Sequence, residues 1–485
     1  MEYQVLRRVP ESAGSLYLWR RLLPLVPRFA GSFGASLGAK LIPSTSAWKT
    51  VAEEWAEEKG SDAMNRMQDT FFDEPGLDTL FVRQITRVGK LIGQIARTRL
   101  WLYVSLGRDQ TGIAERNLRR IPRVAYDSTM LSGLAIGKAL GYFTGGDVHT
   151  HLWYDSESEV RELPEGHPRP QARRFSPPAS LGDLGADIDD LYWAEAYGQG
   201  IKITSVGKGP ERRWLVSIPG TDHPDPASTP NVADIEANMR EELNIPSAMR
   251  LGVVRAIHEA MNREGVPASE HLLEQVLLCG HSQGGIIAAA LAAAEPQEVG
   301  FNVSGVITMG TPSRRFRIRD DVTMVALEHE QDAVPAMDGT PRKEVDHRVV
   351  VQRPLTKPRV GSLYYAHSSS TYTDTLRLLE RRVSVAGWGK TVQVVQRLQE
   401  FLPRPGEPTR VFHHYIWQDV LPSQTSTAWN EFLEFNRHHW EPVTYGDEIT
   451  LSEEPVPTPR QVLAGVSEAV EQAVQSAKKV VNADE

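Results

Sequence analysis

The chain has 485 residues, of which 40% are hydrophobic and 24% charged, and its formal net charge at pH 7 is −9. These fractions are those of a globular protein, so they exclude a wholly disordered or collagen-like chain. The acidic balance argues against nucleic acid as a partner held by bulk positive charge. The single cysteine, Cys279, excludes an intramolecular disulfide and a cysteine-rich zinc site. It fits a reducing, cytoplasmic compartment, with a disulfide-free secreted protein as the alternative.

Residues 1–190 contain several apolar helical patterns interrupted by prolines and end in a Pro/Arg/Ser-rich stretch at 164–178. We expect a largely helical region followed by a solvated linker or long loop. No run reaches the roughly 18 apolar residues of a membrane-spanning helix, and the first residues lack the apolar core of a signal peptide. A soluble cytoplasmic protein is therefore the first expectation. Residues 1–45 mix six basic and two acidic residues with apolar ones, so peripheral contact with anionic lipid, and with it membrane association, is the alternative.

From about 190 to 385, short β-branched runs alternate with helical segments, which predicts a mostly parallel sheet with helices on both faces. The third to fifth expected strands are almost continuously apolar, as is typical of strands buried on both faces. We therefore treat 191–385 as an α/β core, between an N-terminal region of 1–190 and a C-terminal extension of 386–485. The expected strands are 201–205, 213–218, 275–279, 303–309, 322–327 and 348–352.

The C-terminal extension finishes in a segment, 459–481, whose apolar residues recur at spacings of three and four, as on one face of a helix. Docking onto the rest of the chain is the simpler interpretation of this amphipathic helix, and binding of a partner or a membrane surface is the alternative. Residues 441–485 carry nine acidic and three basic side chains, which disfavours anionic lipid as that partner.

The sharpest signal is Gly280-His-Ser282-Gln-Gly284, which follows a predicted strand and leads into an alanine-rich helix. A G-x-S-x-G sequence in this context is typical of a nucleophile elbow, in which the serine sits on a strained turn. The glycines leave room for closely passing backbone, and the helix N-terminus offers free N–H groups to a developing oxyanion. The pattern predicts that Ser282 is a nucleophile, and a structural serine in a glycine turn is the alternative.

Two further elements, Gly310-Thr-Pro312 and Asp332-Ala-Val-Pro335, follow the next two predicted strands. With them, the segment 201–379 resembles the α/β-hydrolase superfamily and, within it, the class 3 lipase-like serine hydrolases. The resemblance implies an α/β-hydrolase fold, a triad in the order serine, acid, histidine, and hydrolysis of a small-molecule ester or lipid. It implies no cofactor and no metal, and it leaves the acyl chain and the oligomeric state open.

For the acid, the resemblance points to Asp332, whose carboxylate would orient the imidazole and stabilise the imidazolium. A turn-forming aspartate before the proline is the alternative for this residue. Glu328 and Glu330 lie close enough in the sequence to be rivals, and Asp338 is a weaker one.

For the base, we expect His367, which follows the last predicted strand and precedes small polar residues suited to cap a helix. Histidine fits the role because its unperturbed pKa near 6.5 lets it take and return a proton at neutral pH. The alternatives are His347 and the pair His413-His414. His281, within the elbow itself, is expected to pack beside the nucleophile.

An oxyanion hole needs two backbone donors. One is expected from Gln283, the residue after the nucleophile, and the other from the Gly220-Thr221 element that ends an earlier predicted strand. Pro219 departs from the class 3 lipase pattern, in which a larger residue precedes the glycine, so the N–H groups of Gly220 and Thr221 both remain candidates.

Histidine pairs such as His149-Thr-His151 lack a carboxylate or cysteine at ligand spacing, so no zinc site is expected, and no phosphate-binding glycine loop is present. The predicted function is hydrolysis of carboxylic esters through Ser282, Asp332 and His367, with residues 1–190 as a cap, lid or membrane-facing module. The alternatives are acyl transfer to another acceptor, thioester cleavage, and a catalytically silent scaffold.

Overall fold

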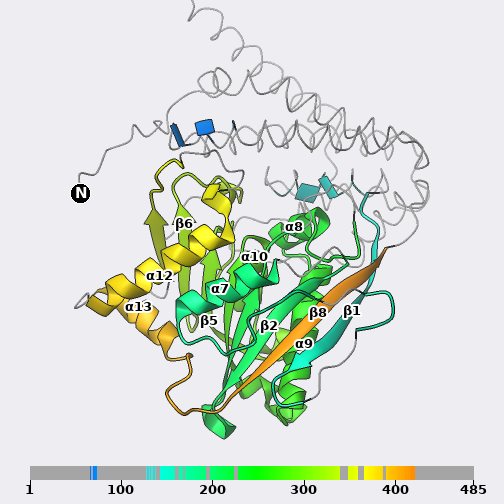
Figure 1. The fold of residues 1–485 in the computed structure, drawn as a ribbon. Coiled ribbons are helices and arrows are strands. Elements are labelled where there is room, and N and C mark those ends of the chain that lie inside the picture. The colour runs from blue at the N-terminus through cyan, green and yellow to red at the C-terminus, as the bar shows by residue number, and fades with distance from the viewer. Residues whose placement is uncertain are drawn as a thin grey trace, which may run out of the picture.

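The fold is that of a computed structural model. It describes residues 142–420 except 159–162, 168–169, 193–196, 223–227, 339–347, 359–364 and 386–388, together with single residues between 66 and 73 and between 127 and 137. The remaining residues are the grey trace of Figure 1. The predicted lipid contact of residues 1–45 and the predicted helix at 459–481 lie outside the described residues.

One mixed sheet of eight strands runs through the described part of the chain, in the order β1-β8-β2-β3-β4-β5-β6-β7 (Figure 1). Strands β3 to β7 pair in parallel, whereas β2, β8 and β1 join them through antiparallel pairs. The six predicted strands coincide with β2 to β7, so the expected α/β architecture is confirmed. The strands are β1 (Gly145–Asp155), β2 (Gln199–Val206), β3 (Arg213–Ile218), β4 (Gln275–His281), β5 (Asn302–Met309), β6 (Thr323–His329), β7 (Arg348–Arg353) and β8 (Thr409–Val420).

The central strand β4 shows that both faces of the sheet are covered. Val276 and Leu278 belong to one apolar cluster, Leu277 and Cys279 belong to another, and all four are fully buried. Because successive side chains of a strand point to opposite faces, the two clusters lie on the two sides of the sheet. Burial on both sides explains why this strand is apolar without alternation, which made it recognisable in the sequence.

Helices cover both faces. The cluster of Val276 and Leu278 includes residues of α9 and α10, and the cluster of Leu277 and Cys279 includes residues of α7, α12 and α13. Helices α7 and α12 lie side by side (Figure 1). The helices are α7 (Leu181–Leu191), α8 (Ile235–Glu242), α9 (Ala248–Arg263), α10 (Gln283–Ala293), α11 (Pro296–Val299), α12 (Ser369–Val385) and α13 (Lys390–Gln399), with 3-10 turns η2 (Gly209–Glu211), η3 (Ala268–Leu273), η4 (Val334–Ala336) and η5 (Tyr365–His367).

Three of the helices start at side-chain caps. Ser180, Asp234 and Ser247 precede α7, α8 and α9, and each side chain accepts a hydrogen bond from a backbone N–H in the first turn. A cap of this kind satisfies one of the N–H groups that lack an intrahelical acceptor and stabilises a helix by about 1 kcal/mol. Helix α10 starts differently, because the residue in its capping position is Ser282, which caps nothing.

The sheet extends beyond 191–385. Strand β1 comes from the region assigned to the N-terminal module and β8 from the C-terminal extension, and the two pair with each other beside β2. The boundaries drawn at 190 and 385 therefore do not coincide with the limits of the sheet. Both strands are rich in histidine, aromatic and charged residues, so they lack the aliphatic runs by which the other strands were recognised.

The Pro/Arg/Ser-rich stretch at 164–178 is an irregular loop, as one expectation had it, but its described residues are not simply solvated. Ala172 is buried beside Trp153 and Tyr415. The carbonyl of Ser176 accepts a hydrogen bond of 2.7 Å from the Lys202 Nζ of β2. The stretch therefore packs against the β1–β8 side of the sheet. Across the described residues, no helix combines the length and apolar character needed to cross a membrane.

Candidate active site

Ser282 stands between β4 and α10 with φ of 50° and ψ of −118°. Positive φ is unusual for a residue with a side chain, and among the described non-glycine residues only Asn244 shares it. The Ser282 N–H donates to the carbonyl of Met309 at the end of β5 (2.9 Å), and the Ser282 carbonyl accepts from the N–H groups of Gly285 and Ile286. Neighbouring backbone therefore holds the strained turn at the carboxyl ends of the parallel strands.

The glycines on either side of Ser282 are required by close backbone contacts. A Cβ atom on Gly284 would overlap the carbonyl oxygens of Ile218 and Pro219, at the end of β3. A Cβ atom on Gly280 would overlap the backbone of Gly284 itself. Only glycine fits these two positions, as expected from the G-x-S-x-G motif, whose glycines leave room for neighbouring backbone.

Ser282, His367 and Asp332 form a hydrogen-bonded row. His367 Nε2 lies 3.0 Å from Ser282 Oγ, and His367 Nδ1 lies 2.8 Å from Asp332 Oδ2. His367 is the last residue of η5, directly before α12, and Asp332 lies in the loop after β6. With the Nδ1 proton on the carboxylate side, Nε2 presents a lone pair to the serine hydroxyl, which is the arrangement of an activated nucleophile. The structure thus brings together the three residues selected from the sequence.

The Asp332 carboxylate is held by three donors. Besides His367, the Tyr372 hydroxyl donates to Oδ2 (2.8 Å) and the Val334 N–H donates to Oδ1 (3.0 Å). Tyr372 in turn accepts from the backbone N–H of His329 and stacks on that ring. Burial raises the pKa of Tyr372 well above its usual value, so the phenol keeps its proton and acts as a donor. Sequence reasoning did not find Tyr372, because nothing in the helix that follows His367 marks it.

The rival acids have other partners. Glu328 is buried and forms an ion pair with Arg314 (2.9 Å between Oε2 and a guanidinium nitrogen). Asp338 accepts a hydrogen bond of 2.7 Å from the backbone N–H of Arg314. Only Asp332, and neither Glu328 nor Glu330, is bonded to the imidazole of His367.

The rival bases are remote from Ser282. His413 and His414 lie on β8, and β2 and β3 separate that strand from β4. Both rings are buried, and burial lowers the pKa of each, that of His413 to about 3. Each therefore stays neutral within the sheet. His347 lies outside the described residues.

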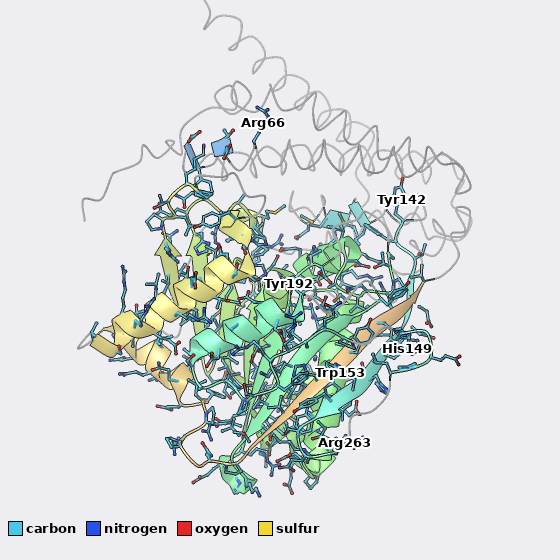
Figure 2. All side chains as sticks on the ribbon, in the orientation of Figure 1. Arg66, Tyr142, His149, Trp153, Tyr192 and Arg263 are labelled. Carbon is cyan, nitrogen blue, oxygen red and sulfur yellow. The ribbon has the colours of Figure 1, made fainter. Side chains whose placement is uncertain are left out.

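His281 packs beside the base, as expected from its place in the elbow. Its ring centre lies 4.9 Å from that of His367, and its Nε2 lies 2.8 Å from the His367 backbone carbonyl oxygen. Its Nδ1 lies 2.5 Å from the hydroxyl of Tyr192, the residue that follows α7 (Figure 2). Burial, reinforced by the nearby His367, holds the pKa of His281 well below its usual value, so the ring is neutral.

The two candidate oxyanion donors after β3, the N–H groups of Gly220 and Thr221, differ in the structure. The Gly220 N–H donates to the Tyr192 hydroxyl (2.7 Å), so it is already engaged. The Thr221 N–H and the N–H of Gln283, the first residue of α10, have no acceptor within the part of the chain that the structure describes. Of the pair Gly220 and Thr221, it is therefore Thr221 that retains a free donor beside Gln283.

Side chains also connect these two donor residues. Asn238 of α8 donates to Thr221 Oγ1 (2.7 Å) and accepts from Gln283 Nε2 (2.9 Å). Gln283 Nε2 donates in addition to the backbone carbonyl of Asp234, the cap of α8 (2.8 Å). Helix α8 thus fixes the loop after β3 against the start of α10, which limits how far the two N–H groups can separate.

A pocket of about 1000 Å³ opens over this row, and Ser282 and His367 line it. Its apolar lining comes from Met130, Ile235, Met239, Ile286, Pro312, Val334 and Met337. Its polar lining includes Ser368, Ser369, Ser370, Thr371 and Asp374 at the start of α12. A concave, partly apolar cavity with a few converging polar groups is the usual form of a small-molecule site.

His149 of β1 is engaged away from this site. His149 lies 3.1 Å from an Asp419 oxygen and stacks on Trp417, at the β1–β8 edge where Figure 2 labels it. Within the described residues, no group of three or more His, Cys, Asp or Glu side chains is arranged to hold a metal ion.

The chain was compared with protein-family models, curated proteins and solved structures, and none of them matches it.

Proposed function

We propose that the protein is a serine hydrolase that cleaves carboxylic esters. The observation that carries the proposal is the row Ser282–His367–Asp332, with contacts of 3.0 and 2.8 Å. Its serine, Ser282, has a strained backbone conformation at the end of the parallel strand β4. A structural serine has no need of positive φ or of an imidazole aligned by a buried carboxylate. Both features are expected of a nucleophile.

In the proposed reaction, Ser282 Oγ attacks the ester carbonyl carbon while His367 Nε2 takes the hydroxyl proton. The carbonyl oxygen becomes an oxyanion, which the N–H groups of Thr221 and Gln283 stabilise. The bond to the alcohol oxygen then breaks, and the imidazolium returns its proton to that oxygen. Water, deprotonated by the same imidazole, releases the acid from the acyl-enzyme and restores the serine hydroxyl.

The pocket supports an ester whose acyl part is apolar. Apolar surface for a hydrocarbon chain comes from Ile235 and Met239 of α8, Ile286 of α10, Met130 and Met337, at roughly 0.8 kcal/mol per buried methylene. The hydroxyls at the start of α12, which also line the pocket, suit a more polar alcohol part. We therefore propose a lipase- or esterase-like substrate rather than a peptide.

We also propose that the fold is that of the α/β-hydrolase superfamily, with the class 3 lipase-like group as the source of the resemblance. The nucleophile after β4, the acid after β6 and the base before α12 follow the chain order serine, acid, histidine. The Gly220-Thr221 and Gly310-Thr311-Pro312 loops end β3 and β5, the strands on either side of β4.

The test is hydrolysis of p-nitrophenyl esters of graded acyl length by the purified full chain and by Ser282→Ala. We expect kcat to fall by roughly 10⁴- to 10⁶-fold in the variant, because nucleophile and base act as a unit. The melting temperature should change little, since the hydroxyl contributes no cap to α10.

Ser304→Ala is the matched control, because Ser304 lies at the opposite, amino-terminal end of β5. It should hydrolyse each ester as the wild type does. Equal turnover by the wild type and Ser282→Ala would contradict the proposal.

A further inference from the structure

A chain of hydrogen bonds links the loop after β3 to the segment of the base. It runs from the Gly220 N–H to the Tyr192 hydroxyl (2.7 Å), from that hydroxyl to His281 Nδ1 (2.5 Å), and from His281 Nε2 to the His367 carbonyl (2.8 Å). Tyr192 and His281 take no part in the row Ser282–His367–Asp332. They nevertheless touch both the loop that carries the free Thr221 N–H and the segment that carries the imidazole.

The groups at the two ends determine the direction of every bond in this chain. The His367 carbonyl can only accept, so His281 Nε2 carries the ring proton and donates. The neutral ring then presents a lone pair at Nδ1, and the Tyr192 hydroxyl must donate to it. The Gly220 N–H can only donate, and the same hydroxyl oxygen accepts from it. Every donor and acceptor of the chain is thus used once, with no alternative tautomer.

The same contacts leave Gly220 no freedom to shift toward Tyr192. A Cβ atom built on Gly220 would lie 2.5 Å from the Tyr192 hydroxyl oxygen, 2.7 Å from Ser282 Cβ and 2.8 Å from the His281 carbonyl oxygen. The hydroxyl therefore packs directly against the peptide that precedes Thr221, next to the nucleophile. Asn238 in turn holds the Thr221 hydroxyl. Both residues of the Gly220–Thr221 segment are thus held by side chains of other elements.

We infer that Tyr192 is a positioning residue of the oxyanion hole. By engaging the Gly220 N–H, with His281 as its fixed acceptor, Tyr192 keeps the next N–H, that of Thr221, directed at the reacting carbonyl oxygen. It exchanges no proton with the substrate. The inference rests on the proposed ester hydrolysis and deepens it, because it names a residue outside the triad on which stabilisation of the oxyanion depends.

The test uses Tyr192→Phe in the full chain, with a p-nitrophenyl ester and with an alkyl trifluoromethyl ketone, which forms a tetrahedral oxyanion on the serine. We expect kcat to fall by roughly 10- to 100-fold while KM changes less than about threefold. A misdirected donor weakens stabilisation of the oxyanion in the transition state and leaves binding of the ester substrate almost unchanged. The affinity for the ketone should fall in the same proportion. The pH midpoint of kcat/KM should stay where it is in the wild type.

The concentration of active sites in each sample is measured by reaction with a fluorophosphonate to completion, and kcat is calculated per titrated site. Unfolded protein in a sample therefore does not lower the measured kcat. Tyr154→Phe is the matched control, because Tyr154 lies on β1, in the aromatic cluster at the other edge of the sheet. It should retain the wild-type kcat and ketone affinity.

A second variant, His281→Asn, places an amide oxygen where Nδ1 lies, so Tyr192 keeps an acceptor. We expect its ketone affinity to stay well above that of Tyr192→Phe. If Tyr192→Phe does not fold, His281→Leu, which leaves the Tyr192 hydroxyl without its acceptor at Nδ1, takes its place in this comparison. Equal ketone affinities of His281→Asn and His281→Leu would then overturn the inference. The inference is overturned if Tyr192→Phe keeps the wild-type kcat, loses kcat without losing ketone affinity, or shifts the pH midpoint. A wild type without Ser282-dependent hydrolysis would instead refute the proposed function first.

Discussion

The two halves of the sheet differ in the direction of their strands and in whether they contribute to the candidate site. The parallel half, β3 to β7, is filled with aliphatic side chains, and every residue of the candidate triad and oxyanion hole follows one of its strands or the helices attached to them. The antiparallel half, β1, β8 and β2, contributes apolar side chains such as Ile201 to the core as well, and it adds the buried pairs of Lys202 with Asp187 and of Arg410 with Asp155. None of these four groups touches the pocket over Ser282.

The comparison teaches that the site depends on the parallel arrangement. The carboxyl ends of parallel strands meet at one edge, where loops can bring residues from distant segments together. The antiparallel half closes the other side of the sheet and contributes stability. Damage to the first half should therefore act on the rate, and damage to the second half on the free energy of unfolding.

The largest expected effect is that of Asp332→Asn. An amide can orient His367 only in the wrong tautomer, so we expect kcat to fall by roughly 10⁴-fold with the fold retained. Steady-state hydrolysis of a p-nitrophenyl ester and a thermal melt would measure the two quantities. A kcat within tenfold of the wild type would show that Asp332 is not the acid and that the parallel half lacks this member of the site.

In the antiparallel half, Lys202→Met should reduce the free energy of unfolding by roughly 3–5 kcal/mol, because it leaves the buried Asp187 carboxylate short of a partner. Burial lowers the pKa of Lys202 and raises that of Asp187, because the loss of water around each group disfavours its charged form. Urea unfolding measures the loss. The double variant Lys202→Met/Asp187→Leu should recover part of it, and a changed kcat per fluorophosphonate-titrated site would break the division between the halves.

A smaller effect is expected at the junction of the halves, where Glu407 binds Arg213 through two contacts of 2.6 and 2.7 Å. The guanidinium of Arg213 lowers the pKa of Glu407 from its usual 4.5 to about 2. Since the carboxylate is more acidic in the folded chain, the pair stabilises it above pH 4.5, and this contribution is lost as the pH falls toward 2.

Glu407→Gln should therefore reduce the free energy of unfolding at pH 7 by about 1–3 kcal/mol, with kcat unchanged. Urea melts of the wild type and the variant should converge as the pH approaches 2. A constant difference between the two melts over that range would show that the lost stability has another origin than the charge of Glu407.

The sequence was sufficient for the inner strands of the parallel half, β3 to β6, because they are mostly buried. Leu277 of β4 and Val306 of β5 belong to aliphatic runs, which are typical of strands covered on both faces. The glycines around Ser282 indicate a close approach of neighbouring backbone. Strands β1 and β8 were missed because their residues alternate among histidine, aromatic and charged types. Their antiparallel pairing depends on a partner more than 250 positions away, as between Asp155 and Phe412.

The candidate triad could be named from the order of its motifs, but its supporting side chains could not. Tyr372, which holds Asp332, and Tyr192, which engages Gly220, are single tyrosines without a pattern around them. The choice between Gly220 and Thr221 as donor was likewise open, since it depends on which N–H the folded chain leaves free. Such contacts arise only from the packing of segments that are distant in sequence.

The most direct test of the central claim is intact-mass and peptide analysis of the full chain after reaction with a fluorophosphonate. The account predicts one adduct, located on Ser282, that is absent from Ser282→Ala and from His367→Ala, because only a serine activated by its base reacts readily. An adduct on another residue, or equal labelling of the wild type and Ser282→Ala, would contradict it.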